Sequence, residues 1–379
     1  MKKILFILIC LFITSTFLSA QEKKSGPPKA KEWKGTGEKI EFQSLPTLTM
    51  RDFLLEKKPG REIKIWGTLN FPDNAEDKNV PAVVILHGMG GVNDAEEHWI
   101  KVINSMGIAT FMVDSNWARR KCKKDNNIKK EIPWCAAMNR GMNRIIDAYG
   151  ALNILSNHPR IDSKNIGCIG ISLGAKGCLY SNVKRFQKMW GTPGMDFAAS
   201  VAMYPPCNAT FKKDDEITDT PIRIHVGELD TYFPVESCVN YVAQLKAKGK
   251  DVEIKVYPGT HHGFEATISG KKSMKIKGQN DGKCYYEENH SLPVDEMASD
   301  DVAILSQVGF DDWYASASDK DKKKIFKRVK MRHKMGWRIP QFQYDRTCVS
   351  KSNILAYNKV ASEENEKLVR EFFSSTLLN

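Results

Sequence analysis

The chain has 379 residues, of which 41 % are hydrophobic, and its formal net charge is +12. This length and apolar content suit one large domain or two ordinary ones with a full core, and they exclude an intrinsically disordered chain. The positive charge is compatible with contact to an anionic surface, but a basic exported protein shows the same excess, and nothing indicates specific nucleic-acid binding.

The first twenty residues have the pattern of a secretory signal peptide. Lys2 and Lys3 precede an apolar run that extends to Leu18, and small residues end at Ala20. A membrane span needs about 20 apolar residues, so this run favours cleavage over anchoring. We expect residues 1–20 to be removed on export, leaving a periplasmic or secreted protein. Residues 21–46, rich in Lys, Gly, Pro and Ser, are expected to form a flexible leader.

From about residue 47 to residue 265, predicted strands and helices alternate. Strands are predicted at 63–71, 82–86, 108–113, 165–171, 198–203, 222–226 and 252–256, and helices at 94–106, 139–155 and 235–248. Several of these strands are continuous apolar runs, as in strands buried on both faces. The alternation predicts an α/β fold with a mostly parallel central sheet and helices on both faces.

The alternation stops after Phe264. Residues 266–352 are rich in Lys, Asp and Ser, and they show no clear period. Residues 353–379 contain an amphipathic helix at 361–378. The simplest interpretation is a long insertion between the last strand of the core and its C-terminal helix.

Residues 170–174, Gly-Ile-Ser-Leu-Gly, match the pattern Gly-x-Ser-x-Gly between a predicted strand and a predicted helix. In that context the serine occupies a sharp, strained turn, where side chains at the two glycine positions would collide with their neighbours. A serine hydroxyl needs a base to accept its proton before it can act as a nucleophile. The motif therefore nominates Ser172 as the nucleophile, against the alternative of a plain Gly-Ser turn.

A base and an acid are expected later in the chain, in the order Ser, acid, His. Asp230 directly follows a predicted buried strand, and Glu228 is its rival. His261 and His262 follow the last predicted strand, and adjacent side chains diverge, so only one of them can face Ser172. No metal or organic cofactor is required by this set of residues.

Catalysis of acyl transfer also needs N–H groups that stabilise an oxyanion. The residue after the nucleophile, Leu173, should supply one of them. The Gly-rich loop at residues 87–91 should supply the other, from Met89 or alternatively from Gly90. This loop lacks the Gly-Lys-Ser/Thr ending of a nucleotide-phosphate loop.

Four stretches together resemble the dienelactone hydrolase family of the α/β-hydrolase superfamily. They are Val84–Gly88, Gly170–Gly174, Gly227–Asp230 and Tyr257–Phe264, and Tyr357–Leu378 is similar to the family's last helix. The resemblance implies the α/β-hydrolase fold and favours His262 over His261, because the family's catalytic His precedes a small residue and Phe. The family's name-giving enzyme has a Cys nucleophile where this chain has Ser172, so a carboxylic ester is a better expectation than a dienelactone.

Nine cysteines are present, and eight are left once Cys10 leaves with the signal peptide. Export makes disulfides the expected use of these thiols, and no Cys-x-x-Cys pair suggests a metal site. Their positions suggest three pairs, Cys122–Cys135, Cys207–Cys238 and Cys284–Cys348. Cys168 and Cys178 lie in a core strand and the next helix, and they are expected to be buried free thiols.

These features predict an exported serine hydrolase acting on a small or polymer-borne ester or lactone through an acyl-serine. A peptidase on the same fold is one alternative. The other is a non-catalytic protein that binds a polyanion or an anionic surface through the basic segment Lys320–Arg338. The insertion at 266–352 is expected to begin at the active-site edge of the sheet and to form a cap, with a surface appendage as the alternative. The sequence does not indicate the oligomeric state.

Overall fold

The computed structural model describes most of the core and parts of the insertion. The described residues are 35, 37–48, 50–56, 58–73, 75, 79–120, 141–267, 270–280, 286–288, 305–307, 318, 320 and 350–378. The signal peptide, four of the candidate disulfide cysteines (Cys122, Cys135, Cys284 and Cys348) and all of the basic segment except Lys320 lie outside this set. The predictions for those residues stay predictions.

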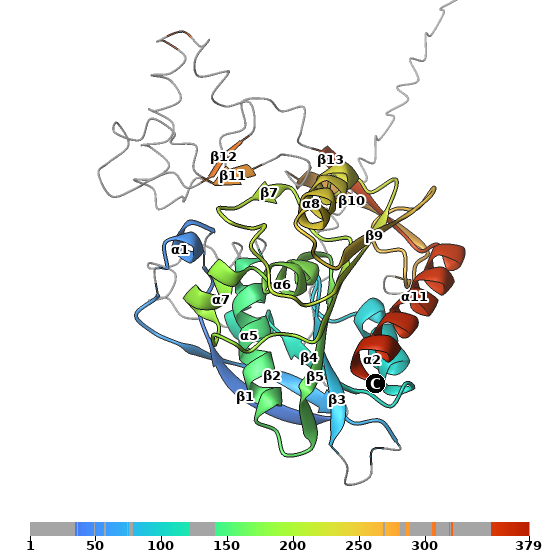
Figure 1. The fold of residues 1–379 in the computed structure, drawn as a ribbon. Coiled ribbons are helices and arrows are strands. Elements are labelled where there is room, and N and C mark those ends of the chain that lie inside the picture. The colour runs from blue at the N-terminus through green and yellow to red at the C-terminus, as the bar shows by residue number, and fades with distance from the viewer. Residues whose placement is uncertain are drawn as a thin grey trace, which may run out of the picture.

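An eight-stranded sheet forms the centre of the molecule (Figure 1). Its strands, in spatial order, are β1 (Glu38–Ser44), β2 (Ile63–Asn70), β4 (Ala109–Asp114), β3 (Val80–Leu86), β5 (Ile161–Ile171), β6 (Ala199–Met203), β8 (Ile222–Gly227) and β9 (Val252–Tyr257). The pairs β1–β2 and β2–β4 are antiparallel, and all other pairs are parallel. The predicted fold class is confirmed, because this mostly parallel sheet with flanking helices is the α/β-hydrolase fold.

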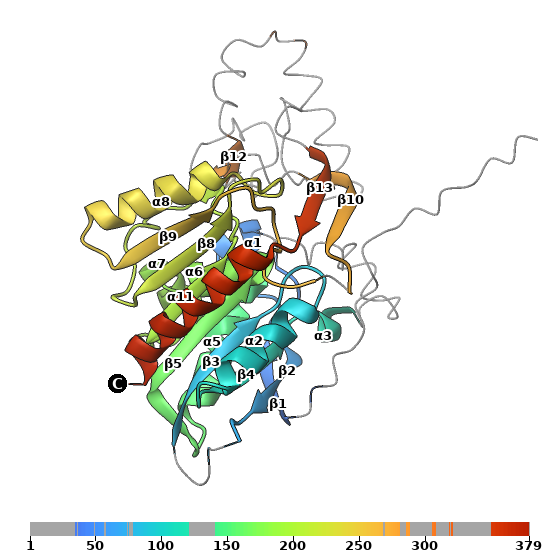
Figure 2. The same cartoon turned by 90° about the vertical axis from the view of Figure 1, so that its right-hand side faces the viewer.

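Helices cover both faces of the sheet. They are α1 (Met50–Leu54), α2 (Asp94–Asn104), α3 (Trp117–Arg120), α5 (Met142–Ser156), α6 (Ala175–Tyr180), α7 (Lys184–Trp190), α8 (Val235–Ala247) and α11 (Lys359–Leu377). Helices α2 and α11 lie side by side on one face, and α5, α6 and α7 cover the other (Figures 1 and 2). Each face of the sheet therefore has an apolar layer beneath its helices, and the core residues of the parallel strands are fully buried.

Strand β1 corrects the prediction of a flexible leader up to residue 46. Residues Glu38–Ser44 pair with β2 along their whole length. Ile40 and Phe42 alternate with charged and polar residues, and Phe42 is buried against Phe111. This two-residue period is that of a half-buried edge strand. The sequence prediction missed this strand because the residues before it are rich in Lys.

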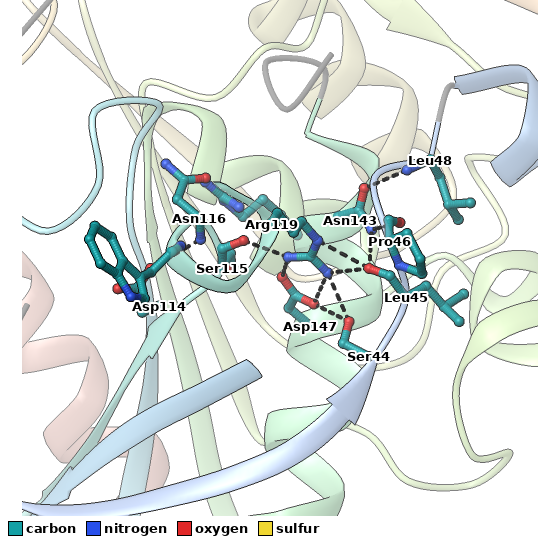
Figure 3. A network of polar contacts seen from close by, with 12 residues as sticks. Ser44, Leu45, Pro46, Leu48, Asp114, Ser115, Asn116, Arg119, Asn143 and Asp147 are labelled. Atoms are coloured by element: carbon teal, nitrogen blue, oxygen red, sulfur yellow. Dashed lines mark hydrogen bonds and ion pairs between the residues drawn. The ribbon is translucent and has the colours of Figure 1, made fainter. Parts of the chain in front are cut away.

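A buried polar network joins the end of β1 to the core (Figure 3). Arg119 forms a two-pronged ion pair with Asp147 at 2.8 and 2.9 Å, and the Ser44 hydroxyl donates to the same carboxylate at 2.5 Å. Arg119 also donates to the carbonyl of Leu45. Burial alone would raise the pKa of Asp147, but the charge and hydrogen bonds of Arg119 lower it overall. The network ties the N-terminal strand to α3 and α5.

The described parts of the insertion return to one end of the sheet. Strands β10 (Ser273–Asn280) and β13 (Ser350–Ala356) form an antiparallel ribbon, and β11 (Tyr286–Glu288) pairs with β12 (Leu305–Gln307) and with β7 (Ala209–Thr210) of the core. Figures 1 and 2 show these strands together at the same end of the molecule. The boundary predicted at residue 353 is therefore too early, because β13 continues to Ala356 and α11 begins at Lys359.

An ion pair fastens the insertion to the core at β11. Glu288 is buried, and both of its carboxylate oxygens accept hydrogen bonds from Arg185 on α7, at 2.7 and 2.8 Å. The N–H of Lys212, just after β7, donates to the same carboxylate at 2.7 Å. The insertion thus contacts the core beyond its two points of connection.

Two disulfides lie in the described part of the chain. Cys207 and Cys238 are bonded, as predicted from their positions after β6 and at the start of α8. The prediction that Cys168 and Cys178 are free thiols is wrong, because the structure joins them. They lie on β5 and α6, whose main chains approach closely enough for the two Cα atoms to be 5.5 Å apart. The sequence pattern showed that both were buried, but not that they faced each other.

Candidate active site

Ser172 occupies a sharp turn between β5 and α6. Its φ angle is +53°, in the left-handed region that residues with a side chain rarely adopt. A Cβ at position 170 would lie 2.4 Å from the carbonyl oxygen of Gly174, and a Cβ at position 174 would lie 2.0 Å from that of Leu86. Glycine is thus required at both positions of the motif. The turn leaves Ser172 partly exposed among buried neighbours.

The structure brings Ser172, His262 and Asp230 together at the carboxyl ends of β5, β9 and β8. His262 Nε2 lies 2.8 Å from the Ser172 hydroxyl, and His262 Nδ1 lies 2.7 Å from Asp230 Oδ2. The other oxygen of Asp230 accepts from the N–H groups of Tyr232 and Phe233. The side chains of His262 and Asp230 are only 4 % and 2 % exposed. This geometry allows His262 to take a proton from Ser172 while Asp230 orients the ring.

The two rival residues have other partners. His261 is partly exposed, and its Nδ1 lies 2.9 Å from the carbonyl oxygen of Leu229. Glu228 is exposed, and its carboxylate accepts from the N–H of Gly259 at 2.7 Å. Both contacts join the loop after β8 to the loop after β9. These residues therefore hold the two loops against each other, while their neighbours Asp230 and His262 meet Ser172.

Aromatic rings surround His262, and the sequence analysis did not identify them. The ring centres of Tyr204, Tyr232 and Phe233 lie 4.2, 4.6 and 5.7 Å from that of His262. Tyr204 is buried and donates from its hydroxyl to Glu265 at 2.5 Å. Burial raises the pKa of Glu265 above its usual value. The rings exclude water from most of the imidazole, which strengthens its interaction with Asp230.

The Gly-rich loop after β3 lies beside Ser172. A Cβ at Gly88 would be 3.6 Å from the Cβ of Ser172, and the following residue, Met89, is 41 % exposed. Leu173, the other residue expected to supply an oxyanion donor, begins the turn into α6 and is buried. The loop therefore runs directly past the nucleophile.

Two side chains missed by sequence reasoning hold this loop from one side. Asn116 Nδ2 donates to the carbonyl of Met89 at 3.0 Å, and its Oδ1 accepts from Arg144 at 2.9 Å. Arg144 Nε also donates to the carbonyl of His87 at 3.3 Å. Burial lowers the pKa of Arg144 to about 10. Asn116 lies two residues after β4, at the carboxyl edge of the sheet, and this position is the sequence signal that could have identified it.

Glu96 holds the loop from the other side. One carboxylate oxygen accepts from the N–H of Gly88 at 3.0 Å and the other from that of Asn93 at 2.9 Å. The second contact is half of a capping box at the start of α2, whose other half is the side chain of Asn93. Burial raises the pKa of Glu96 to about 8. The same residue thus caps a helix and fixes the backbone beside Ser172.

Among the residues that the structure describes, no group of three or more His, Cys, Asp or Glu side chains is arranged to hold a metal ion. Within the same residues, every helix is too short or too polar to cross a membrane.

The sheet order, the strained serine and the Ser–His–Asp geometry define a hydrolase of the α/β-hydrolase fold. The family model described as the dienelactone hydrolase family matches residues 65–283. The chain belongs to this family. No curated protein matches the chain.

Solved structures of similar fold include hydrolases of low sequence identity. One is a dienelactone hydrolase-like promiscuous phosphotriesterase from metagenomic libraries, 15 % identical, which aligns over 62 % of this chain and 87 % of that one with a TM-score of 0.42. Another is a thermophilic esterase of the Planctomycetes species Thermogutta terrifontis bound to propionate, 16 % identical, which aligns over 55 % of this chain and 83 % of that one with a TM-score of 0.41.

Proposed function

We propose that the chain is an exported serine hydrolase that cleaves carboxylic esters, or lactones, through an acyl intermediate on Ser172. The observation that carries the proposal is the unbroken series of hydrogen bonds from Asp230 through His262 to Ser172. The strained backbone at Ser172 supports it, because a nucleophile displayed on such a turn can reach a carbonyl carbon. A protein that only binds a ligand has no need of this arrangement.

In the proposed mechanism, Ser172 Oγ attacks the carbonyl carbon while His262 Nε2 accepts the hydroxyl proton. The bond to the alcohol oxygen then breaks, and His262 gives that proton to the leaving alcohol. Water attacks the acyl-Ser172, again through His262, and releases the acid. Asp230 orients His262 and stabilises its charged form throughout. With a lactone, the released hydroxyl stays on the acyl chain, and hydrolysis of the acyl-Ser172 releases a hydroxy acid.

The N–H groups of Leu173 and Met89 are the proposed oxyanion donors, with Gly90 as the alternative to Met89. The close approach of Gly88 to Ser172 supports this choice, since Met89 and Gly90 are the next residues of the same loop. Asn116, Arg144 and Glu96 serve as positioning residues, because they hold the loop through its carbonyls and through the N–H of Gly88.

The insertion is proposed to cap this site. Its described strands return to the end of the sheet at which β5, β8 and β9 finish, and the Glu288–Arg185 ion pair keeps β11 on the core. Export is proposed from the signal-like start of the chain. The disulfides Cys168–Cys178 and Cys207–Cys238 support it, because such bonds persist in oxidising compartments.

Labelling with a fluorophosphonate probe tests the mechanism. The wild-type protein is expected to take up one equivalent of probe on the peptide that contains Ser172 and to hydrolyse p-nitrophenyl esters. Ser172→Ala is expected to lose labelling and to lower kcat by about 10⁵–10⁶-fold while it stays folded. Labelling at another residue, or near wild-type turnover in the variant, would contradict the proposal. A parallel set of p-nitroanilide substrates tests the peptidase alternative, since faster amide than ester cleavage would favour it.

A further inference from the structure

Strand β13, by which the insertion re-enters the core, lies against the loops that carry Asp230 and His262. The N–H of Ile354 donates to Thr231 Oγ1 at 2.9 Å, and the N–H of Ala356 donates to the carbonyl of His262 at 3.1 Å. Leu355 also forms a parallel β-bridge with His262. One short segment thus contacts the residue after Asp230 and His262 itself.

The direction of these hydrogen bonds follows from the strand period. Successive N–H groups of an extended chain point to opposite sides, so residues 354, 356 and 358 share one side. All three donate to the catalytic loops, the last of them from Asn358 to the carbonyl of Phe264 at 3.1 Å. The N–H of Tyr357 points the other way and donates to Lys272, next to β10. The segment therefore has one edge on the ribbon of the insertion and one edge on the catalytic loops.

We infer that Thr231 is a positioning residue, which sets the Asp230–His262 contact by tying the Asp230 loop to β13. The inference rests on the proposed function and deepens it. Of the three acceptors on this edge, two are main-chain carbonyls and only Thr231 Oγ1 belongs to a side chain. It is also the acceptor that lies on the loop of the acid, so the same strand holds acid and base at a fixed separation. Catalysis in this chain is thereby coupled to the ribbon that supports the insertion.

The test compares three variants, each of which differs from the wild type by one non-hydrogen atom. Thr231→Val keeps the shape but removes the acceptor, whereas Thr231→Ser keeps the acceptor. Thr267→Val is the matched control, because Thr267 lies at the entry to the insertion and its hydroxyl donates to Asp94 on α2 instead, at 2.9 Å. Each protein is assayed with p-nitrophenyl acetate and with the fluorophosphonate probe. A low-field ¹H NMR spectrum monitors the proton between His262 Nδ1 and Asp230 Oδ2.

Thr231→Val is expected to lower kcat and the labelling rate by roughly tenfold or more, with KM changed by less than about twofold, because a small misplacement of catalytic groups affects the chemical step most. Its low-field signal should broaden or disappear. Thr231→Ser and Thr267→Val should match the wild type in all three measurements.

Three results would overturn the inference. They are wild-type kcat and an unchanged signal in Thr231→Val, equal impairment in Thr231→Ser, and equal impairment in Thr267→Val. Failure of the proposed function can be distinguished from failure of this inference, because the wild-type protein would then neither hydrolyse esters nor react with the probe. In that case the NMR signal of the variants alone decides whether Thr231 positions the pair.

Discussion

Gly227, the last residue of β8, lies so close to Thr260 that a Cβ at position 227 would be 2.4 Å from the carbonyl oxygen of Thr260. The N–H of Leu229 donates to that same oxygen at 2.8 Å. The loop that carries Asp230 is therefore packed directly on the loop that carries His262, with no side chain between the two main chains.

Gly227→Ala is expected to separate these loops and to weaken both stability and turnover. Because the contact is with backbone, the added methyl group cannot be accommodated by a rotamer change, and overpacking of this kind costs about 1–3 kcal/mol. A small shift of the acid relative to the base should lower kcat by about tenfold or more. Urea unfolding and ester kinetics check the two effects. Gly60→Ala is the control, because a Cβ at position 60 would have open space around it.

His261 and His262 are expected to respond very differently to replacement by Ala. Loss of His262 removes the base and should lower kcat by about 10⁴-fold or more. Loss of His261 removes only a hydrogen bond to the carbonyl of Leu229, so kcat should fall by less than about tenfold. Steady-state kinetics of the two variants decide the matter. A larger loss in His261→Ala would mean that their roles are exchanged.

Asn116→Ala should lower kcat although Ser172, His262 and Asp230 themselves are unchanged. The substitution releases the carbonyl of Met89 and leaves Arg144 without its acceptor on Asn116. Removal of an oxyanion donor costs about 10²–10³-fold in kcat, and a displaced donor should cost somewhat less, about 10–100-fold, with little change in KM. Asn104→Ala is the control, because Asn104 holds backbone at the opposite end of β4. That variant should lose stability but keep kcat; equal kcat in both variants would refute a role for Asn116.

Glu96 should make the protein less stable as pH rises from about 4.5 to 8. Burial raises its pKa to about 8, so over this range the folded state keeps a proton that the unfolded state, with a pKa of 4.5, has lost. The free energy of unfolding therefore falls with pH, by up to about 1.4 kcal/mol per unit, and the loss is complete above pH 8. Glu265 adds a contribution of the same sign.

Glu96→Gln removes this titration. Urea unfolding at pH 5 and pH 8 should show the stability of the variant rising relative to the wild type between the two values. Glu97→Gln, at the exposed neighbouring position, should leave the difference unchanged. Parallel stability curves for Glu96→Gln and the wild type would show that Glu96 ionises alike in the folded and unfolded states.

The cap is tested by replacing residues 281–349 with a short Gly/Ser linker. Residues 280 and 350 are register partners in the ribbon, so a turn of a few residues can join them and leave β10 and β13 in place. Under the predicted pairing of Cys284 with Cys348, both cysteines leave together and the change leaves no unpaired thiol. If the insertion restricts the site, bulky p-nitrophenyl esters should gain relative to short ones while Ser172 still reacts with the probe. Unchanged selectivity in the folded variant would favour a surface appendage.

The parts that the sequence predicted are those encoded by local spacing. Gly170, Ser172 and Gly174 lie within five residues, and their collisions can be inferred from the turn alone. The buried parallel strands are continuous apolar runs, so their positions followed from composition. Asp230 and the neighbours His261 and His262 were nominated because they follow such strands, and the resemblance to the dienelactone hydrolase family decided for His262.

The parts that were missed depend on contacts between distant segments. Asn116 forms hydrogen bonds with Met89 and Arg144, which are 27 and 28 residues away in the sequence. No local sequence pattern predicts either contact. Tyr204 reaches Glu265 across 61 residues. Strands β10 and β13 are rich in Lys, Ser and Asn and lie outside the eight-stranded sheet, and neither has the long apolar run that reveals a buried core strand.

Strand β1 also determines where a recombinant chain should begin. A chain started at residue 47, where the leader was predicted to end, would lack the partner that covers the outer edge of β2. It would also remove Ser44 from the carboxylate of Asp147 and the Leu45 carbonyl from Arg119, and a buried ion pair would be left with unsatisfied groups. The newly exposed edge of β2 is a template for intermolecular pairing, so this shortened protein should aggregate, whereas one that begins before residue 37 keeps β2 covered by β1.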